Sequence, residues 1–400
     1  MMKSLVFSGL ALLSLTACEV KVNGQQVTSS GKQVSEQRQV TPFESIDNHS
    51  FFDVVVTQGK ETSLSISGDE KLVPEIETVV ENKHLIIRNK SKSYSFSWNN
   101  HKPGTITIST PVLLSLEQSG SGDIDIRTLQ ADQFDIAQTG PGDVQISGKV
   151  SQLKIQSSAS GDMKLDELQA DNVSLDLSGP GDVHMGKIMQ ALDIHSSGSG
   201  DLRIRDLQQI PVKLMHSGPG DILLRGQITT LEGQSSGSGN LTVDGAKLSQ
   251  GELEMSGPGD LKLSGEADKL MLRISGSGDV SGRDFVIQHL EVSNQGPADL
   301  NFRNIRQSLK ADISGSGDFD AKLDNAEKIE LSMNGPGDVS LRGQAKNLKA
   351  QVQGSGNLRA KDLLLDAASI KVTGPSNAEV NVKKANGSRI VKIDRNGVES

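Results

Sequence analysis

The residues in this sequence whose types and spacing could most clearly support binding or catalysis are a regularly spaced set of aspartates and asparagines. Each residue closes a motif of the form Gly-Ser-Gly-Asp or Gly-Pro-Gly-Asp, which recurs with small variations at two strictly alternating intervals. Eleven positions are aspartate and three are asparagine: Asp123, Asp143, Asp162, Asp182, Asp201, Asp221, Asn240, Asp260, Asp279, Asp299, Asp318, Asp338, Asn357 and Asn377. Carboxylates at a fixed interval could bind cations such as calcium. Alternatively, each side chain could accept hydrogen bonds from backbone N–H groups of its own glycine turn.

The turn-capping role is the favoured one of these two. Calcium-binding nonapeptide repeats use a much shorter period than this motif does. Carboxylates stacked about 4.8 Å apart would also repel one another by about 1 kcal/mol in water. Asparagine keeps the hydrogen-bond acceptor while it removes the charge, so its presence at three positions favours turn capping. We therefore expect no metal site and no cofactor, with a weak cation ladder as the open alternative.

The serine of the Gly-Ser-Gly motif is not expected to be a nucleophile. A nucleophilic serine needs a strand–turn–helix setting and a histidine partner, whereas this serine recurs in turn after turn and the seven histidines share no register. Acidic residues could serve a polysaccharide-processing enzyme on a β-helix, but such a site needs a unique carboxylate cluster in a cleft. The sequence therefore predicts no catalytic residues.

The residues around each motif predict the strands that position it. The residue after the aspartate or asparagine is apolar in all fourteen units, and the residue two further on is usually apolar. This period-two alternation is typical of a strand with one buried face. A second apolar position later in each unit predicts a second short strand, and Gly-Pro-Gly suits a type II turn. An all-β, parallel β-solenoid follows, with one coil per unit or, alternatively, one coil per 39-residue pair of units.

The repeats occupy residues 119–380, and their two ends need caps because solenoid ends expose unpaired strand edges. We expect residues 41–118 to form a β-rich N-terminal cap, with strands at 52–56, 63–67, 84–87 and 105–108, and residues 381–400 to form a C-terminal cap and tail. Tyr94, Phe96 and Trp98 alternate on one face of an expected strand and include the only tyrosine and tryptophan of the chain. They form either a packed cap or a recognition patch for a glycan or protein partner.

The N-terminus has the pattern of an export signal. Lys3 precedes an apolar stretch that is too short to span a membrane. The residues that end at Cys18 resemble a lipobox, the site at which bacterial lipoprotein precursors are cleaved and acylated on cysteine. We expect residues 1–17 to be a lipoprotein signal peptide, Cys18 to carry the lipid that attaches the protein to a membrane, and residues 18–40 to be a flexible tether. Glu19 favours the outer membrane in the sorting that this resemblance implies.

Several segments before and at the first repeat occur in a recognisable order. They are FDVVVTQG at 52–59, SGDE at 67–70, HLII at 84–87, ITISTP at 106–111 and SGSGD at 119–123. In this order they resemble the head GIN domain family, a family of unknown function that is labelled putative auto-transporter adhesin. The resemblance covers roughly residues 40–380. It implies a right-handed parallel β-helix, often carried by exported bacterial proteins, although this chain has more regular repeats than expected of a small member.

These features lead to one expectation for function and one alternative. We expect a lipid-anchored envelope lipoprotein whose solenoid acts as a non-enzymatic, adhesin-like or structural binding surface, facing either the periplasm or the outside. The alternative is a polysaccharide-processing β-helix enzyme. The net charge of -9 and the lack of a basic stripe with interleaved aromatic residues in the repeats disfavour a nucleic-acid partner.

Overall fold

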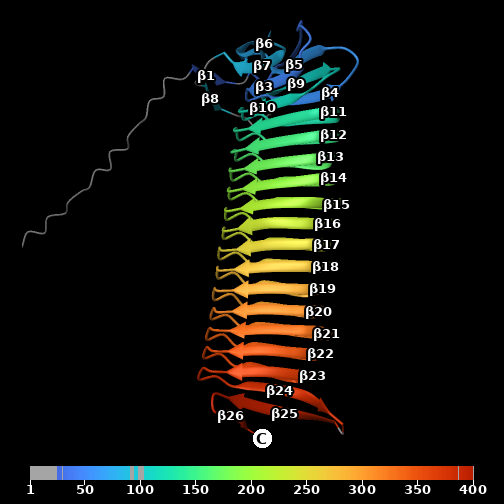
Figure 1. Ribbon diagram of the computed structural model, residues 1–400. Coiled ribbons are helices and arrows are strands. Elements are labelled where there is room, and N and C mark those ends of the chain that lie inside the picture. Colours follow the sequence, from blue (N-terminus) through green and yellow to red (C-terminus); the bar gives the residue numbers. More distant parts are fainter. Residues whose placement is uncertain (1–24, 29, 91–93, 98–102, 386, 400) are drawn as a thin grey trace, which may run out of the picture.

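Thirteen long parallel strands of the described residues stack into a column (Figure 1). The computed structural model describes residues 25–28, 30–90, 94–97, 103–385 and 387–399. The stacked strands are β11 (Ile124–Gln138), β12 (Val144–Ser157), β13 (Met163–Leu177), β14 (Val183–Ser196), β15 (Leu202–His216), β16 (Ile222–Ser235), β17 (Leu241–Met255), β18 (Leu261–Ile274), β19 (Val280–Asn294), β20 (Leu300–Ile313), β21 (Phe319–Met333), β22 (Val339–Val352) and β23 (Leu358–Val372). Each pairs in parallel with the next, as β11 does with β12 and β12 with β13. The predicted parallel β-solenoid is confirmed.

Each coil corresponds to a single repeat unit. Val144 lies beside Ile124 of the preceding coil and beside Met163 of the following one. The alternative of one coil per 39-residue pair is therefore wrong. The unit that follows Asn377 contributes only the shorter strand β24 (Ala378–Lys384).

A single bent strand fills most of each coil, where the sequence predicted two short strands joined by a turn. The pairing of β11 with β12 continues through the bend with a register shift between Ile126 and Leu129. Several coils place a residue with positive φ at this bend, for example Gly148 (φ 134°) and Gly265 (φ 114°). One residue of left-handed backbone redirects the chain while the hydrogen-bonded ladder continues on both sides. The prediction of a separate second strand is wrong for this reason.

The segment before the column closes its N-terminal end. Its described elements are β1 (Gln25–Thr28), β2 (Gln33–Arg38), β3 (Ser45–His49), β4 (Asp53–Gln58), β5 (Ser63–Asp69), a 3-10 helix η1 (Val73–Glu75), β6 (Ile76–Glu81), β7 (His84–Asn89), β8 (Tyr94–Ser97), β9 (Gly104–Thr110) and β10 (Ser115–Gln118). The four strands predicted here are confirmed as β4, β5, β7 and β9. β4 and β10 pair in parallel with the two halves of β11 and together complete a coil. β5 and β6 then add antiparallel strands to β9 and β7.

The C-terminal end of the column is closed by an antiparallel meander. β24 pairs in parallel with β23, whereas β25 (Gly387–Asp394) and β26 (Gly397–Glu399) continue antiparallel from it. The reversal of direction ends the stacking of coils. In the described part of the chain, no helix has the length and apolar character needed to cross a membrane.

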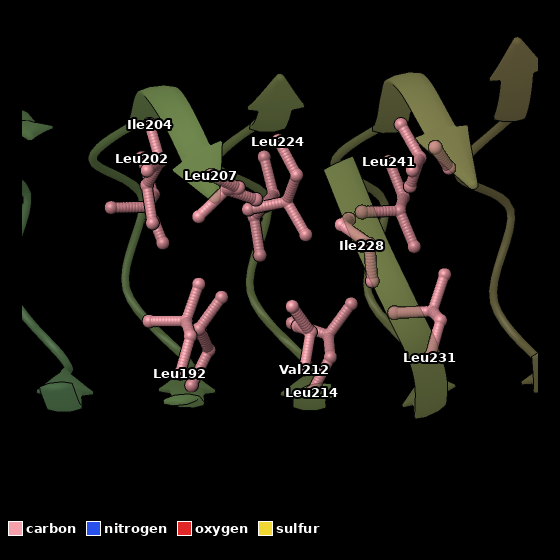
Figure 2. Close-up of a cluster of buried hydrophobic side chains, with 14 of the residues drawn as sticks. Leu192, Leu202, Ile204, Leu207, Val212, Leu214, Leu224, Ile228, Leu231 and Leu241 are labelled. Carbon is pink, nitrogen blue, oxygen red and sulfur yellow. The ribbon is translucent and has the colours of Figure 1, made fainter. Parts of the chain in front are cut away.

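The core is a set of apolar columns inside the coils. Leu202 and Leu224 project inward from the first halves of β15 and β16, and Val212 and Leu231 project from the second halves and meet them (Figure 2). All four side chains are at most 1% exposed. Full burial of such a side chain stabilises the fold by about 1.5–3 kcal/mol relative to exposure. Because the same positions are apolar in coil after coil, this stabilisation is distributed along the whole column.

Candidate functional site

The glycine turns of successive coils stack directly on one another. A Cβ atom added at Gly276 would overlap the carbonyl oxygen of Gly257 in the preceding coil, and one added at Gly278 would overlap that of Gly259. The small size of glycine therefore allows the turns to approach at the spacing of adjacent strands, and alanine or serine replaces a motif glycine only at Ala159, Ala298 and Ser376. No motif glycine has positive φ, so the type II turn predicted for Gly-Pro-Gly is wrong. The stack of turns forms a continuous edge along the column and brings the motif aspartates and asparagines into one line.

Each side chain in this line accepts a hydrogen bond from the next coil. Oδ1 of Asp123 accepts from the N–H of Asp143 at 3.0 Å, and Oδ1 of Asp143 accepts from the N–H of Asp162 at 2.9 Å. Fourteen such bonds, of 2.7–3.1 Å, connect Asp53 to Asn377 without a break. The side chains are thus backbone acceptors, as expected. The expectation that the donors belong to the same turn is wrong, because the donors lie one coil further on.

Asp53 begins this line, although it precedes the repeats and was not identified from the sequence. Its Oδ1 accepts from the N–H of Asp123 at 3.1 Å. The signal that could have revealed it is an aspartate followed by alternating apolar residues, Val54 and Val56, which resembles the start of every coil strand. The N-terminal cap therefore supplies the first acceptor of this line of hydrogen-bonded side chains, which we call the ladder.

Asparagine fits the ladder because it can both accept and donate. Oδ1 of Asn240 accepts from the N–H of Asp260 at 3.0 Å, while its Nδ2 donates to Oδ1 of Asp221 at 3.2 Å. Asn357 donates to Asp338 in the same way. Each asparagine also removes one negative charge from the line. Among the described residues, no group of three or more His, Cys, Asp or Glu side chains is arranged to hold a metal ion.

Basic side chains neutralise part of the ladder. Lys164 Nζ lies 2.8 Å from Asp143 Oδ2, and Arg359 lies 2.6 Å from Asp338 Oδ2. Partial burial would raise the pKa of Asp143, but the hydrogen bonds from Lys164 and from the N–H of Asp162 outweigh it and hold that pKa below its usual value. The other oxygen of these carboxylates is therefore used for charge pairing, while Oδ1 holds the backbone.

A buried polar column lies just inside the turns and was not predicted. Its members are Asn48 of the N-terminal cap and seven inward residues that precede the glycine motif: Gln118, Gln138, Ser157, Ser196, His216, Ser235 and Asn294. Gln118 Nε2 donates to the carbonyl oxygen of Gly122 at 2.7 Å, and Asn48 Nδ2 donates to Gln118 Oε1 at 2.8 Å. These amides satisfy carbonyl groups that the turn leaves inside the coil. The detectable signal is a polar residue where the alternation requires an inward position.

His216 is the exception in this column. It is 2% exposed and lies between Ser196 and Ser235 of the adjacent coils. Neither ring nitrogen has a hydrogen-bond partner in the part of the chain that the structure describes. Burial lowers the pKa of His216, and the nearby backbone of Gly239 and Ser196 only partly opposes this effect. The imidazole is therefore held neutral inside the column.

The outer surface of the second strand halves contains three successive grooves, which we call the groove face. Their volumes are about 420 Å³ over β11–β15, about 320 Å³ over β14–β18 and about 410 Å³ over β18–β22. The middle groove contains Glu232, Glu252 and Glu254 together with Arg273. The grooves lie between outward side chains of consecutive coils, and no coil from β11 to β23 carries an insertion that would build a deeper cleft.

Two other predicted sites fall largely outside the described residues. Cys18 and Trp98 are outside them, as are residues 1–17. The backbone of Tyr94 and Phe96 belongs to β8, which pairs in parallel with β1. Their side chains are outside the described part of the structure, so the recognition patch and the lipid anchor stay predictions.

Several solved structures are similar to this chain. A protein of Bacteroides fragilis described as a putative adhesin is 19% identical, with 69% of this chain and 99% of that chain covered and a TM-score of 0.31. A putative adhesin of Parabacteroides merdae is 13% identical, with 90% and 99% covered and a TM-score of 0.23. A putative lipid binding protein of Parabacteroides distasonis is 15% identical, with 88% and 99% covered and a TM-score of 0.22.

The family comparison covers nearly all of the solenoid and its N-terminal cap. No curated protein matches the chain. A family model matches it in three overlapping stretches, residues 42–227, 211–322 and 303–392. These stretches include the glycine turns, the coil strands and the segments that the sequence resemblance rested on. The chain belongs to the family described as putative auto-transporter adhesin, head GIN domain.

Proposed function

We propose that this protein is a non-enzymatic, adhesin-like surface of a bacterial cell envelope, attached to the outer membrane through a lipid on Cys18. The solenoid presents its turns and outer faces at a fixed spacing along a rigid column. Many weak contacts with a glycan or protein ligand along such a column combine into strong attachment. The adhesin description of the family supports this proposal.

The uniformity of the coils is the observation that carries the proposal. Strands of two nearly equal lengths alternate from β11 to β23, and each is joined to the next by the same glycine turn. An active site needs a unique set of groups in one place. A multivalent surface instead needs similar groups many times over, and this is the arrangement that the coils provide.

The carboxyl groups in and near the grooves favour a binding surface over a polysaccharide-processing enzyme. A glycoside hydrolase needs one carboxyl group with a raised pKa as its general acid. In the middle groove, Glu252 is ion-paired with Arg273 at 2.5 Å. Among the described carboxyl groups, those with a clear pKa shift all have lowered values: Glu70, Glu77, Asp143, Asp244 and Glu330. The alternative of an enzyme therefore has less support than the binding surface.

Deletion of one pair of coils tests the multivalent mechanism. Removal of residues 202–240 or of residues 261–299 keeps the alternation of the turns and shortens the column by the same length. Cells that carry either shortened protein should attach to an immobilised ligand somewhat less strongly than cells with the full chain. Complete loss of attachment with one deletion and none with the other would indicate a single localised site and contradict the proposal.

The anchor and its orientation need a separate test. Cys18→Ser should move the protein from the membrane fraction to the soluble fraction, because the acyl chains would be lost. A variant that stays in the membrane would contradict lipid anchoring. Cleavage of the column by protease added to whole cells would indicate a surface-facing protein, which an adhesin requires, and protection in intact but not in permeabilised cells would indicate a periplasmic one.

A further inference from the structure

Five basic residues form a row along one outer face of the column, on the first halves of the strands. They are the fourth residues of five consecutive strands, β19 to β23: Arg283, Arg303, Lys322, Arg342 and Lys361. We call them the basic row. Lys322 lies directly beside Arg342 in the pairing of β21 with β22. All five side chains are exposed, and adjacent strands are about 4.8 Å apart.

Like charges in this row contrast with the opposite charges found elsewhere, except at its end, where the pairing of β22 with β23 places Asp362 beside Arg342. At the same strand position in β16 and β17, Arg225 forms an ion pair with Asp244 at 2.9 Å. On the groove face, Lys310 pairs with Glu291 of the preceding coil at 2.6 Å. Within the basic row, only Arg342 forms an ion pair with a described residue, Asp320 at 2.9 Å.

The fold does not require positive charge at these positions. Two earlier coils have serine there, Ser147 in β12 and Ser264 in β18. Unit charges about 5 Å apart repel by about 1 kcal/mol in water, and the described neighbours of Arg283, Arg303 and Lys322 provide no ion pair to offset this. A ligand with regularly spaced negative charges would remove this repulsion.

The surroundings of the row match the chemistry of an acidic sugar. A hollow of about 360 Å³ over β20–β22 is lined by Arg303, Lys322 and Arg342 together with Asn301 and Asp320. The second residues of β19 to β22 form a neighbouring column of half-exposed groups: Ser281, Asn301, Asp320 and Ser340. Three of them are neutral hydrogen-bonding groups, and the charge of Asp320 is paired with Arg342. Cations beside hydroxyl and amide groups can bind a carboxylate and the hydroxyl groups of the same sugar ring.

We propose that the basic row binds an extended anionic polysaccharide that carries one carboxylate per sugar and runs parallel to the solenoid axis. The length of a sugar unit in such a polymer is similar to the spacing of the coils, so successive carboxylates can face successive cations. A single-stranded nucleic acid fits less well, because such binding uses aromatic rings that stack on bases. Phe302 and Phe319 of this region are buried in the core instead. This inference identifies the class of ligand for the proposed adhesin-like surface, and it therefore rests on that proposed function.

Binding of polygalacturonate to the purified full chain tests the proposal. The uncharged control is the same polymer with its carboxylates converted to methyl esters. We expect binding of polygalacturonate that weakens as salt is added, since exposed charge pairs are screened, and no binding of the esterified polymer. Equal binding of both polymers, or tighter binding of a single-stranded polynucleotide than of polygalacturonate, would overturn the proposal.

Matched charge variants locate the site. The triple variant Arg283→Gln, Arg303→Gln and Lys322→Gln should bind polygalacturonate at least about tenfold more weakly, because each exposed charge pair contributes up to roughly fivefold. The control variant Lys60→Gln, Lys71→Gln and Lys149→Gln has the same net charge and alters exposed residues away from the row. It should bind like the wild type. Equal weakening in both triple variants would show only a net-charge effect and would overturn the assignment.

Three further measurements distinguish loss of ligand binding from unfolding of the variant and from loss of cell adhesion. The melting temperature of the basic-row variant should match that of the wild type, and the charge-preserving variant Arg283→Lys, Arg303→Lys and Lys322→Arg should bind polygalacturonate normally. Failure of the charge-preserving variant to bind would contradict a mechanism based on charge. If the protein binds polygalacturonate but cells that lack it adhere normally, the adhesin function fails and the polysaccharide site stands. If adhesion requires the protein but not the basic row, the row is not the adhesion site, and the link between the inference and the proposed function fails.

Discussion

Two substitutions of Asp279 distinguish a hydrogen-bonded column of turns from a cation ladder. Oδ1 of Asp279 accepts a hydrogen bond of 2.9 Å from the N–H of Asp299, and its own N–H donates one of 2.8 Å to Asp260. Asp279→Ala removes both the acceptor and the charge. Asp279→Asn removes only the charge, because an amide oxygen can replace Oδ1, as it does at Asn240.

The difference between the two variants isolates one hydrogen bond. Both variants relieve repulsion with the neighbouring carboxylates, which is about 1 kcal/mol for each neighbour in water and less at physiological salt. Asp279→Asn should therefore be neutral or slightly stabilising. Asp279→Ala should be less stable than Asp279→Asn by about 1 kcal/mol, the net value of a typical hydrogen bond. This corresponds to a change of roughly fivefold in the equilibrium constant for local opening.

Amide hydrogen exchange at the N–H of Asp299 measures this effect at the affected bond. A local measurement is needed because repeat proteins open in parts. We expect exchange to be roughly fivefold faster in Asp279→Ala than in Asp279→Asn. A chelator should leave the urea unfolding midpoint of the wild type unchanged. Equally fast exchange in the two variants, or a lower midpoint with chelator, would refute the hydrogen-bond explanation and favour a bound cation.

Three further predictions concern the turns and the core. Gly276→Ala should destabilise the protein by about 2–3 kcal/mol, because the added Cβ overlaps the carbonyl oxygen of Gly257; thermal unfolding measures this, with the exposed Ser277→Ala as a near-neutral control. Leu272→Ala should cost about 2–5 kcal/mol in a urea unfolding measurement, because the side chain is fully buried; a cost below about 1 kcal/mol would contradict its core role. The lowered pKa of His216 means that the unfolded chain binds its proton more readily, so its contribution to stability is present above about pH 6.5 and is lost as the pH falls. Unfolding at about pH 8 and about pH 5 should show a smaller loss in His216→Leu than in the wild type, and an equal loss would contradict this role.

The solenoid itself could be predicted from the sequence because its signals are local. The apolar residues after Asp123 and Asp143 alternate within one strand, and the glycine motif marks the turn before it. The regular spacing of the motif then relates each strand to the next. The bend at Gly148 was predicted as a turn between two strands, because the sequence does not show that pairing continues on both sides of a residue with positive φ.

The partner of each motif aspartate could not be predicted in the same way. Along the chain, the nearest donors to Asp123 are the N–H groups of its own turn. In the folded protein, these groups bond to the preceding coil, as the N–H of Gly122 does to the carbonyl oxygen of Ser50. The carboxylate is left to accept from the following coil at Asp143.

Three features follow from the sequence alone: the repeating unit, the buried face of each strand and the place of each turn. They depend on alternation, glycine and proline within a single unit. Which side chains of different coils lie together depends instead on the three-dimensional fold. The fold stacks the motif aspartates into one hydrogen-bonded ladder, encloses His216 without a hydrogen-bond partner among the described residues and places Lys322 beside Arg342. Contacts between coils depend on strand register, and the register is set by how the turns and bends of neighbouring coils stack.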